Sequence, residues 1–114
     1  MNNIELEKII DQAWDKKEEV NKHSDKKIID AINQTVNNLD SGLVRVAEKI
    51  DGSWITHQYL KKAIMLSFRI YDMEALSGPY SSWYDKSHLI KGKTAGWTKE
   101  DHVKAGFRMG PNSP

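Results

Sequence analysis

The sequence of 114 residues contains no cysteine. Disulfide bonds, thiolate catalysis and structural zinc sites of the cysteine type are therefore excluded. An excess of charge of one sign is missing as well, since 17 basic residues stand against 16 acidic ones and the two kinds are interspersed. Electrostatic steering toward a polyanion needs Lys and Arg clustered on one face. We therefore expect no nucleic-acid partner.

Long hydrophobic runs are also absent. No apolar stretch approaches the roughly 20 residues that span a bilayer. Residues 2–7 are acidic and amphipathic, and they have neither the basic region nor the apolar region of a signal peptide. We therefore expect no membrane partner and a cytoplasmic location.

Apolar residues recur at the three-and-four spacing of amphipathic helices in the first forty residues. The spacing predicts a first helix over residues 4–20, with Trp14 on its buried side. A second helix is predicted to begin after Ser24 as its N-cap and to end at Gly42 in the left-handed conformation. The polar residues 21–25 would make the two helices antiparallel neighbours. The predicted buried stripe of the second helix is Ile28, Ile29, Ile32, Val36 and Leu39.

A β-hairpin is predicted next. Residues 43–50 are rich in β-branched side chains, and Asp51-Gly52 follows as a two-residue hairpin signal. We expect Trp54 and Ile55 in the second strand to fill the packed face of the hairpin.

Thr56 is predicted to cap a third helix, with His57 in its first turn and Lys61 and Lys62 facing outward. Its end, residues 65–70, fits either a helix or a strand by its pattern. The predicted buried face is Leu60, Ala63, Ile64 and Ser67 or Phe68.

The periodicity is lost over residues 71–96, which still carry aromatic side chains in an irregular segment. One interpretation, which we favour, is that these side chains pack on the domain's own core. The alternative is that the aromatic loop of residues 80–97 docks onto a protein partner. The side chains concerned are Tyr80, Trp83, Tyr84 and Leu89.

The last segment predicts a short helix. Thr98 and Asp101 have the spacing of a capping box, and Gly106 should stop the helix. Residues 107–109 are a candidate strand. The patterns of the whole chain predict an α+β fold, mainly helical, with three to four helices and one β-hairpin.

No catalytic or metal-binding constellation is visible. Gly92-Lys93-Thr94 resembles the end of a phosphate-binding loop, but Ser87 stands where that motif requires glycine. The histidines show no pair at metal-ligand spacing on one helix, so we expect no metal site. No general acid or base pair can be argued from spacing alone, because many Asp and Glu residues fall on predicted solvated helix faces, so we expect no catalytic residue. The four histidines are His23, His57, His88 and His102.

Residues 39–70, read together with Gly106-Phe107-Arg108, resemble the N-terminal domain of the tetrahydrodipicolinate N-succinyltransferase family. The resemblance is dense over residues 39–70, thinner over the first helices and weak over residues 73–95. It implies an N-terminal domain over residues 1–109, with residues 110–114 a disordered or non-native tail. In that family the domain precedes a left-handed parallel β-helix of hexapeptide repeats, which are absent from this sequence.

The resemblance also implies a function and partners. Family members transfer a succinyl group from succinyl-CoA, their co-substrate, to tetrahydrodipicolinate in lysine and diaminopimelate biosynthesis. The family's substrate-binding arginine corresponds to Arg108, and a guanidinium can grip a carboxylate with two charge-assisted hydrogen bonds. The implied partners are a small dicarboxylate substrate, the family's β-helix domain and the other subunits of a homotrimer. No cofactor is expected on residues 1–114, which alone should be inactive because the succinyl-CoA site lies in the β-helix domain. The alternative function is a non-catalytic interaction module that uses the loop of residues 80–97.

Overall fold

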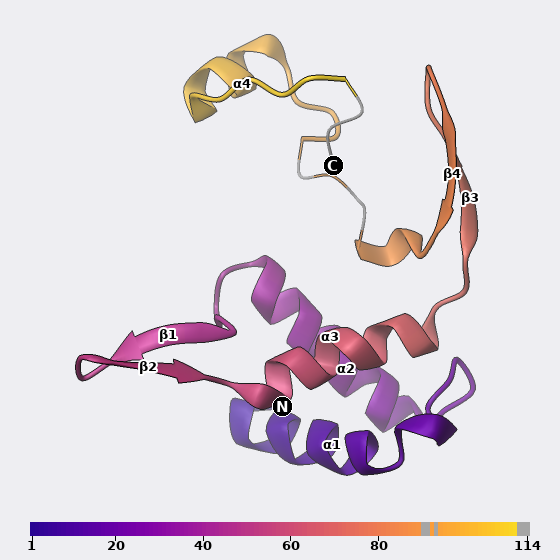
Figure 1. The fold of residues 1–114 in the computed structure, drawn as a ribbon, viewed down its shortest axis with the longest axis vertical. Helices are drawn as coiled ribbons and strands as arrows, with labels where there is room; N and C mark the ends of the chain where they lie inside the picture. Colours follow the sequence, from indigo (N-terminus) through magenta and orange to yellow (C-terminus); the bar gives the residue numbers. More distant parts are fainter. Residues whose placement is uncertain (90–91, 93, 112–114) are drawn as a thin grey trace. The chain divides into compact units, whose positions relative to one another are not determined.

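The structure, a computed structural model, describes residues 1–89, 92 and 94–111 (Figure 1). The chain divides into two compact units, Met1–Asp72 and Met73–Pro114, which we call the first unit and the second unit. The first unit is built from three helices and one strand pair, and the second from a strand pair and a short helix. The α+β class predicted from the sequence is confirmed, with one strand pair more than expected.

The first helix is shorter than predicted. α1 covers Asn3–Asp15, and a capping box opens it: Glu5 N–H donates to Asn2 Oδ1 at 2.9 Å, and Asn2 N–H donates to Glu5 Oε2 at 3.2 Å. At Lys16 the backbone leaves the helical region, and the 3₁₀ turn η1, Lys17–Glu19, follows. The predicted continuation to residue 20 was therefore wrong.

The early end of α1 has a consequence for packing. After η1 the chain brings Val20 into the core, where its side chain is 5% exposed. Trp14 packs against the edge of the core as a partly buried residue, and Lys17 Nζ lies 4.9 Å from the centre of its ring. The indole thus faces the core, as predicted, but it remains partly open to solvent.

α2 covers Lys26–Asp40, and its N-cap lies one residue later than predicted. The carboxylate of Asp25 accepts a hydrogen bond from Lys27 N–H at 3.0 Å. The Ser24 hydroxyl accepts instead from Asn21 N–H, at 2.9 Å, and thereby closes the preceding turn. Both side chains are good caps, so local propensity alone could not decide between them.

Glycines close two turns as predicted. Gly42 follows the end of α2 with a φ of +78°, and Leu43 N–H reaches back to Asn38 O at 2.9 Å. Asp51 and Gly52 have φ values of +49° and +81° between the first two strands. Positive φ at both central residues is the geometry of a type I′ hairpin turn.

The first hairpin consists of β1, Ala47–Ile50, and β2, Ser53–Thr56, paired antiparallel. The hairpin was predicted, but β1 begins at Ala47 and not at residue 43. The prediction that Trp54 and Ile55 fill a packed face was wrong, since their side chains are 73% and 39% exposed. Neighbouring residues of a strand point to opposite faces. In Figure 1 the hairpin projects away from the three helices, and seven of its eight strand residues are exposed.

α3 covers Gln58–Ile70, so the residues that fitted either a helix or a strand are helical. Its N-cap is His57 and not Thr56. Lys62 does not face outward freely, because its Nζ lies 2.7 Å from Asp11 Oδ1 of α1. The buried residues of α3 are Tyr59, Leu60, Ala63, Leu66, Ser67 and Ile70. Leu60, Ala63 and Ser67 were predicted; Phe68 is 39% exposed.

α1, α2 and α3 pack against one another in pairs and form the core. Burial of apolar side chains from three elements is the main stabilising term for such a unit. No helix of the described residues is both long enough and apolar enough to cross a membrane. The core residues are Leu6, Ile10, Ala13, Val20, Ala31, Ile32, Tyr59, Leu60, Ala63, Leu66 and Ile70.

The second unit contains a hairpin that the sequence did not predict. β3, Glu74–Ser77, pairs antiparallel with β4, Ser82–Asp85, and the 3₁₀ turn η2, Ser87–Leu89, follows. The Trp83 ring covers Gly78 so closely that a Cβ there would lie 2.6 Å from the ring. The four-residue connection lacks the Asn-Gly or Asp-Gly signal of a tight hairpin, which explains why the pattern was missed.

The aromatic side chains of this segment do not pack into a core of their own unit. Tyr80, Trp83 and Tyr84 are 75%, 44% and 71% exposed. The favoured interpretation was therefore wrong for these three residues. The side chain of Leu89 and the backbone of residues 112–114 lie outside the described part of the chain.

Candidate functional site

The resemblance singled out Arg108, which follows the last helix, α4, Lys99–Ala105. The predicted capping box is present: Asp101 N–H donates to Thr98 Oγ1 at 3.3 Å, and Thr98 N–H donates to Asp101 Oδ2 at 2.8 Å. These hydrogen bonds from the backbone and the side chain of Thr98 lower the pKa of the Asp101 carboxyl. The start of this short helix is therefore defined by local contacts.

The end of α4 determines the direction in which the chain continues toward Arg108. Gly106 has a φ of +79°, and its N–H donates to His102 O at 3.1 Å. A left-handed residue at this position ends the helix and redirects the chain, as predicted. Residues 107–109 then belong to no strand, so that prediction was wrong. A strand requires a neighbouring strand to bond with, and none of the described strands pairs with this segment.

Three rings gather beside this exit point. The centre of the His102 ring lies 5.2 Å from that of Trp97 and 6.1 Å from that of Phe107, both in edge-to-face geometry. The Trp97 and Phe107 rings are 6.0 Å apart and tilted. We call these three residues the aromatic trio. It joins the turn before α4, the helix itself and the segment after it.

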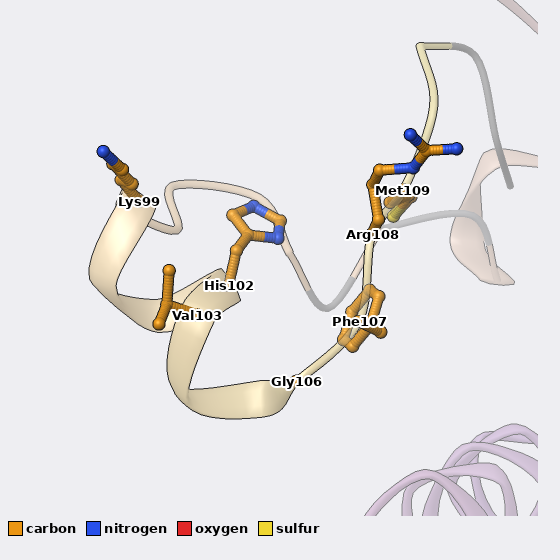
Figure 2. Close-up of a pocket in the computed structure, with 7 residues that line it drawn as sticks. All are labelled: Lys99, His102, Val103, Gly106, Phe107, Arg108 and Met109. Atoms are coloured by element: carbon orange, nitrogen blue, oxygen red, sulfur yellow. The ribbon is translucent and has the colours of Figure 1, made fainter.

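An open depression of about 500 Å³ lies over the same segment (Figure 2). Its lining contains Lys99, His102 and Arg108 but no acidic side chain. Two permanent cations without a carboxylate favour an anionic ligand. The full lining is Lys99, His102, Val103, Gly106, Phe107, Arg108 and Met109.

Arg108 is exposed, and no described residue forms an ion pair or a hydrogen bond with its guanidinium. In Figure 2 the Arg108 and Lys99 side chains point away from one another, with His102 between them. The described residues thus present an arginine ready for a ligand but do not enclose a site around it. Its five N–H donors can still take a carboxylate.

A second polar cluster lies at the base of the first hairpin and was not predicted. His57 Nε2 lies 2.8 Å from Glu48 Oε1, and both line a smaller depression together with Tyr59. Burial, and to a smaller degree Glu7, raises the pKa of the Tyr59 hydroxyl. The strand register carries the signal for this pair: Glu48 lies opposite Ile55, so His57, two residues further on, is its diagonal neighbour on the same face. The cluster ties the hairpin to the start of α3.

The other chemical motifs give no site. Among the described residues, no three His, Asp or Glu side chains gather as metal ligands. Of the sequence Gly92-Lys93-Thr94, Lys93 lies outside the described residues. Ala95 N–H donates to Gly92 O at 3.0 Å, which makes a turn of this segment and not the start of a helix.

A family model described as "Tetrahydrodipicolinate N-succinyltransferase N-terminal" matches residues 5–70. This range coincides with the first unit and ends before Arg108. The helical core and the first hairpin are therefore the parts that the family model describes.

Curated relatives match nearly the whole chain. A protein of Pelagibacter ubique is 66% identical over 110 residues, which is 96% of this chain and 40% of the relative. Proteins of Parvibaculum lavamentivorans and Burkholderia mallei are 39% and 44% identical, over 99% and 94% of this chain and 40% and 38% of their own. All three are named 2,3,4,5-tetrahydropyridine-2,6-dicarboxylate N-succinyltransferase. The chain spans about two fifths of the length of these relatives.

Proposed function

Because the chain belongs to the tetrahydrodipicolinate N-succinyltransferase N-terminal domain family, we propose that it is the substrate-site part of such an acyltransferase. The reaction moves a succinyl group from succinyl-CoA to the amino group of ring-opened tetrahydrodipicolinate, in lysine and diaminopimelate biosynthesis. The name shared by the relatives supports the activity and the acceptor.

Arg108 is the residue that binds the acceptor in this proposal. The observation that carries it is an exposed guanidinium without a partner among the described residues, on the wall of a depression that has no acidic lining residue. The acceptor is a dicarboxylate, and an arginine fork binds a carboxylate through two parallel charge-assisted hydrogen bonds. The match to the Pelagibacter ubique relative covers 96% of the chain, so it extends over this position.

The remaining three fifths of the relatives' length would supply the rest of the machinery. In this proposal it forms the β-helix domain, holds succinyl-CoA and joins the subunits of a cytoplasmic homotrimer. Residues 1–114 alone would have no transferase activity, because succinyl-CoA would have no site. Of the residues that line the depression at Arg108, none is a carboxylate that could act as the base for acyl transfer.

A chimera tests the proposal. The matching part of the Pelagibacter ubique relative is replaced by residues 1–110 of this chain, and turnover of tetrahydrodipicolinate with succinyl-CoA is measured. We expect an active chimera in which Arg108→Ala raises KM for the acceptor by about tenfold or more, the loss expected for a charge-assisted contact. Arg108→Lys should raise KM by a smaller factor, because an ammonium keeps the positive charge but cannot form the bidentate contact.

Lys104→Ala is the matched control, since Lys104 is an exposed cation near Arg108, in α4, that does not line the depression. It should leave KM unchanged. A folded chimera without turnover, or an Arg108→Ala chimera with unchanged KM, would contradict the proposal. Turnover by residues 1–114 alone would contradict the part that places succinyl-CoA elsewhere.

The exposure of Tyr80 and Tyr84 favours a second candidate, a non-catalytic interaction module that uses the loop of residues 80–97. Exposed aromatic side chains are enriched at protein interfaces. This candidate predicts a chimera that folds but does not turn over. An active chimera therefore decides against it.

A further inference from the structure

The segment that carries Arg108 is held by side chains and not by its backbone. Among the described residues, no backbone-to-backbone hydrogen bond engages residues 107–109. Gly106 ends the helical hydrogen bonding just before them. A backbone without such bonds moves unless side-chain contacts restrain it.

The aromatic trio supplies such contacts at Phe107, and Thr94 Oγ1 lies 3.9 Å from Met109 Sδ at the other end of the segment. Phe107 is the residue next to Arg108, and its ring meets both other rings, at 6.0 Å from Trp97 and 6.1 Å from His102. Edge-to-face geometry is the preferred arrangement of such rings. Fixing the Phe107 ring fixes the direction in which the chain continues, and hence the Cα from which the guanidinium extends.

His102 has a special place in the trio. It is the member that α4 carries, it is partly buried, and its ring contacts both partners, with the shortest separation of 5.2 Å to Trp97. Its carbonyl also accepts the hydrogen bond from Gly106 that ends the helix. In Figure 2 the His102 ring lies on the Phe107 side of the helix, in the depression that Arg108 lines.

We propose that His102 is a positioning residue for Arg108, and that it acts through aromatic packing on Phe107 and not through a charge of its own. This inference rests on the proposed role of Arg108 as the carboxylate-binding residue. A guanidinium that is pre-oriented loses less conformational freedom when it binds, so affinity for the acceptor rises. The chemical step is not involved, so kcat should be independent of His102.

Two substitutions separate packing from charge. In the chimera, His102→Ala should raise KM for tetrahydrodipicolinate by about threefold to tenfold while kcat stays within about twofold. His102→Phe keeps an aromatic ring and removes the ionisable nitrogens, so it should restore KM. His23→Ala is the control, because it makes the same change at an exposed histidine of the first unit.

Arg108→Ala, measured in parallel, distinguishes the two ways to fail. If Arg108→Ala leaves KM unchanged, the proposed function is wrong. If Arg108→Ala raises KM and His102→Ala does not, the positioning role is wrong. If His102→Ala and His102→Phe raise KM equally, a charge or hydrogen bond of the imidazole acts, and the packing role is overturned.

A direct readout of position uses residues 1–114 and does not depend on activity. The ¹⁵N heteronuclear NOE of the Arg108 amide should be high in the wild type and in His102→Phe, and lower in His102→Ala. If the heteronuclear NOE of the Arg108 amide is the same in His102→Ala as in the wild type, the inference is overturned even if the chimera is inactive.

Discussion

The first unit and the second unit are each stabilised internally by a different kind of contact. In the first unit, eleven apolar side chains are buried in one core, ten from the three helices and Val20 from the segment after η1. In the second unit, none of the described residues is buried. Its elements are held by a strand pair, a capping box and three ring contacts. A core restrains many residues together, whereas such contacts restrain their immediate neighbours.

The difference matters because the proposed substrate residue lies in the second unit. The family model matches the first unit, where the core determines the fold, and stops before Arg108. Regions with few buried contacts open at low free-energy cost and are frequent in binding segments. We therefore expect single substitutions to act broadly in the first unit and locally in the second.

The largest effect is expected from Leu60→Ala in α3. The Leu60 side chain is fully buried in the core, so its truncation should cost about 2–5 kcal/mol of unfolding free energy. Urea denaturation followed by circular dichroism measures it. Met65→Ala in the same helix is the control, because Met65 is 55% exposed and its loss should cost far less. Equal losses from both would remove the contrast between core and surface.

A smaller effect is expected from Gly78→Ala in the second unit. The added Cβ would lie 2.6 Å from the Trp83 ring, and over-packing typically costs about 1–3 kcal/mol. The ring is 44% exposed and can swing out, so the lower end of that range applies. The indole N–H resonance of Trp83 should shift while the signals of α1 to α3 stay in place. Gly92→Ala, where a Cβ meets only Thr94 Oγ1 at 3.9 Å, should shift nothing.

Thr98→Ala should weaken α4 by about 1 kcal/mol, because it removes the N-cap of a helix of seven residues. So short a helix has little other support. The backbone chemical shifts of Lys99–Ala105 should move toward random-coil values, and Thr98→Ser should restore them. Unchanged shifts in Thr98→Ala would mean that contacts outside the cap hold the helix.

The smallest effect is a pH dependence of the same cap. In the folded chain the pKa of Asp101 lies below its ordinary value of 3.8. The contribution of the Asp101 carboxylate to the stability of α4 is therefore fully present above that value and is lost as the pH falls through the folded pKa. An NMR titration from about pH 6 to about pH 2 follows the carboxyl and the helix amides together. Thr98→Ala should move the midpoint up toward 3.8. A wild-type midpoint at or above that value would contradict the cap geometry.

The contrast between the units also explains which features were predictable. The three-and-four spacing predicted all three helices of the first unit, because a helix on a core must present an apolar face. The hairpin of Met73–Pro114 was missed, since β3 and β4 have four residues each and no tight-turn signal between them. Short strands in exposed positions need no alternating pattern.

For the candidate site, the resemblance supplied Arg108 and the residues alone did not. Sequence spacing shows neither the exposure of a single arginine nor the absence of carboxylates around it. The contact of His102 with Phe107 depends on how the chain turns at Gly106, and the His57–Glu48 pair depends on strand register. These relations follow from the path of the backbone.

By itself, the sequence determined that the first unit has three helices, that Asp51-Gly52 forms a two-residue hairpin turn and that Thr98 opens a capping box, although the end of α1 and the N-caps of α2 and α3 differ from the prediction. Each depends on residues within a few positions of one another, so local geometry suffices. Only the tertiary structure decided that Trp54 is exposed and that Lys62 pairs with Asp11, 51 residues away. Burial and long-range pairing depend on which surfaces meet when the helices pack, and no local pattern encodes that.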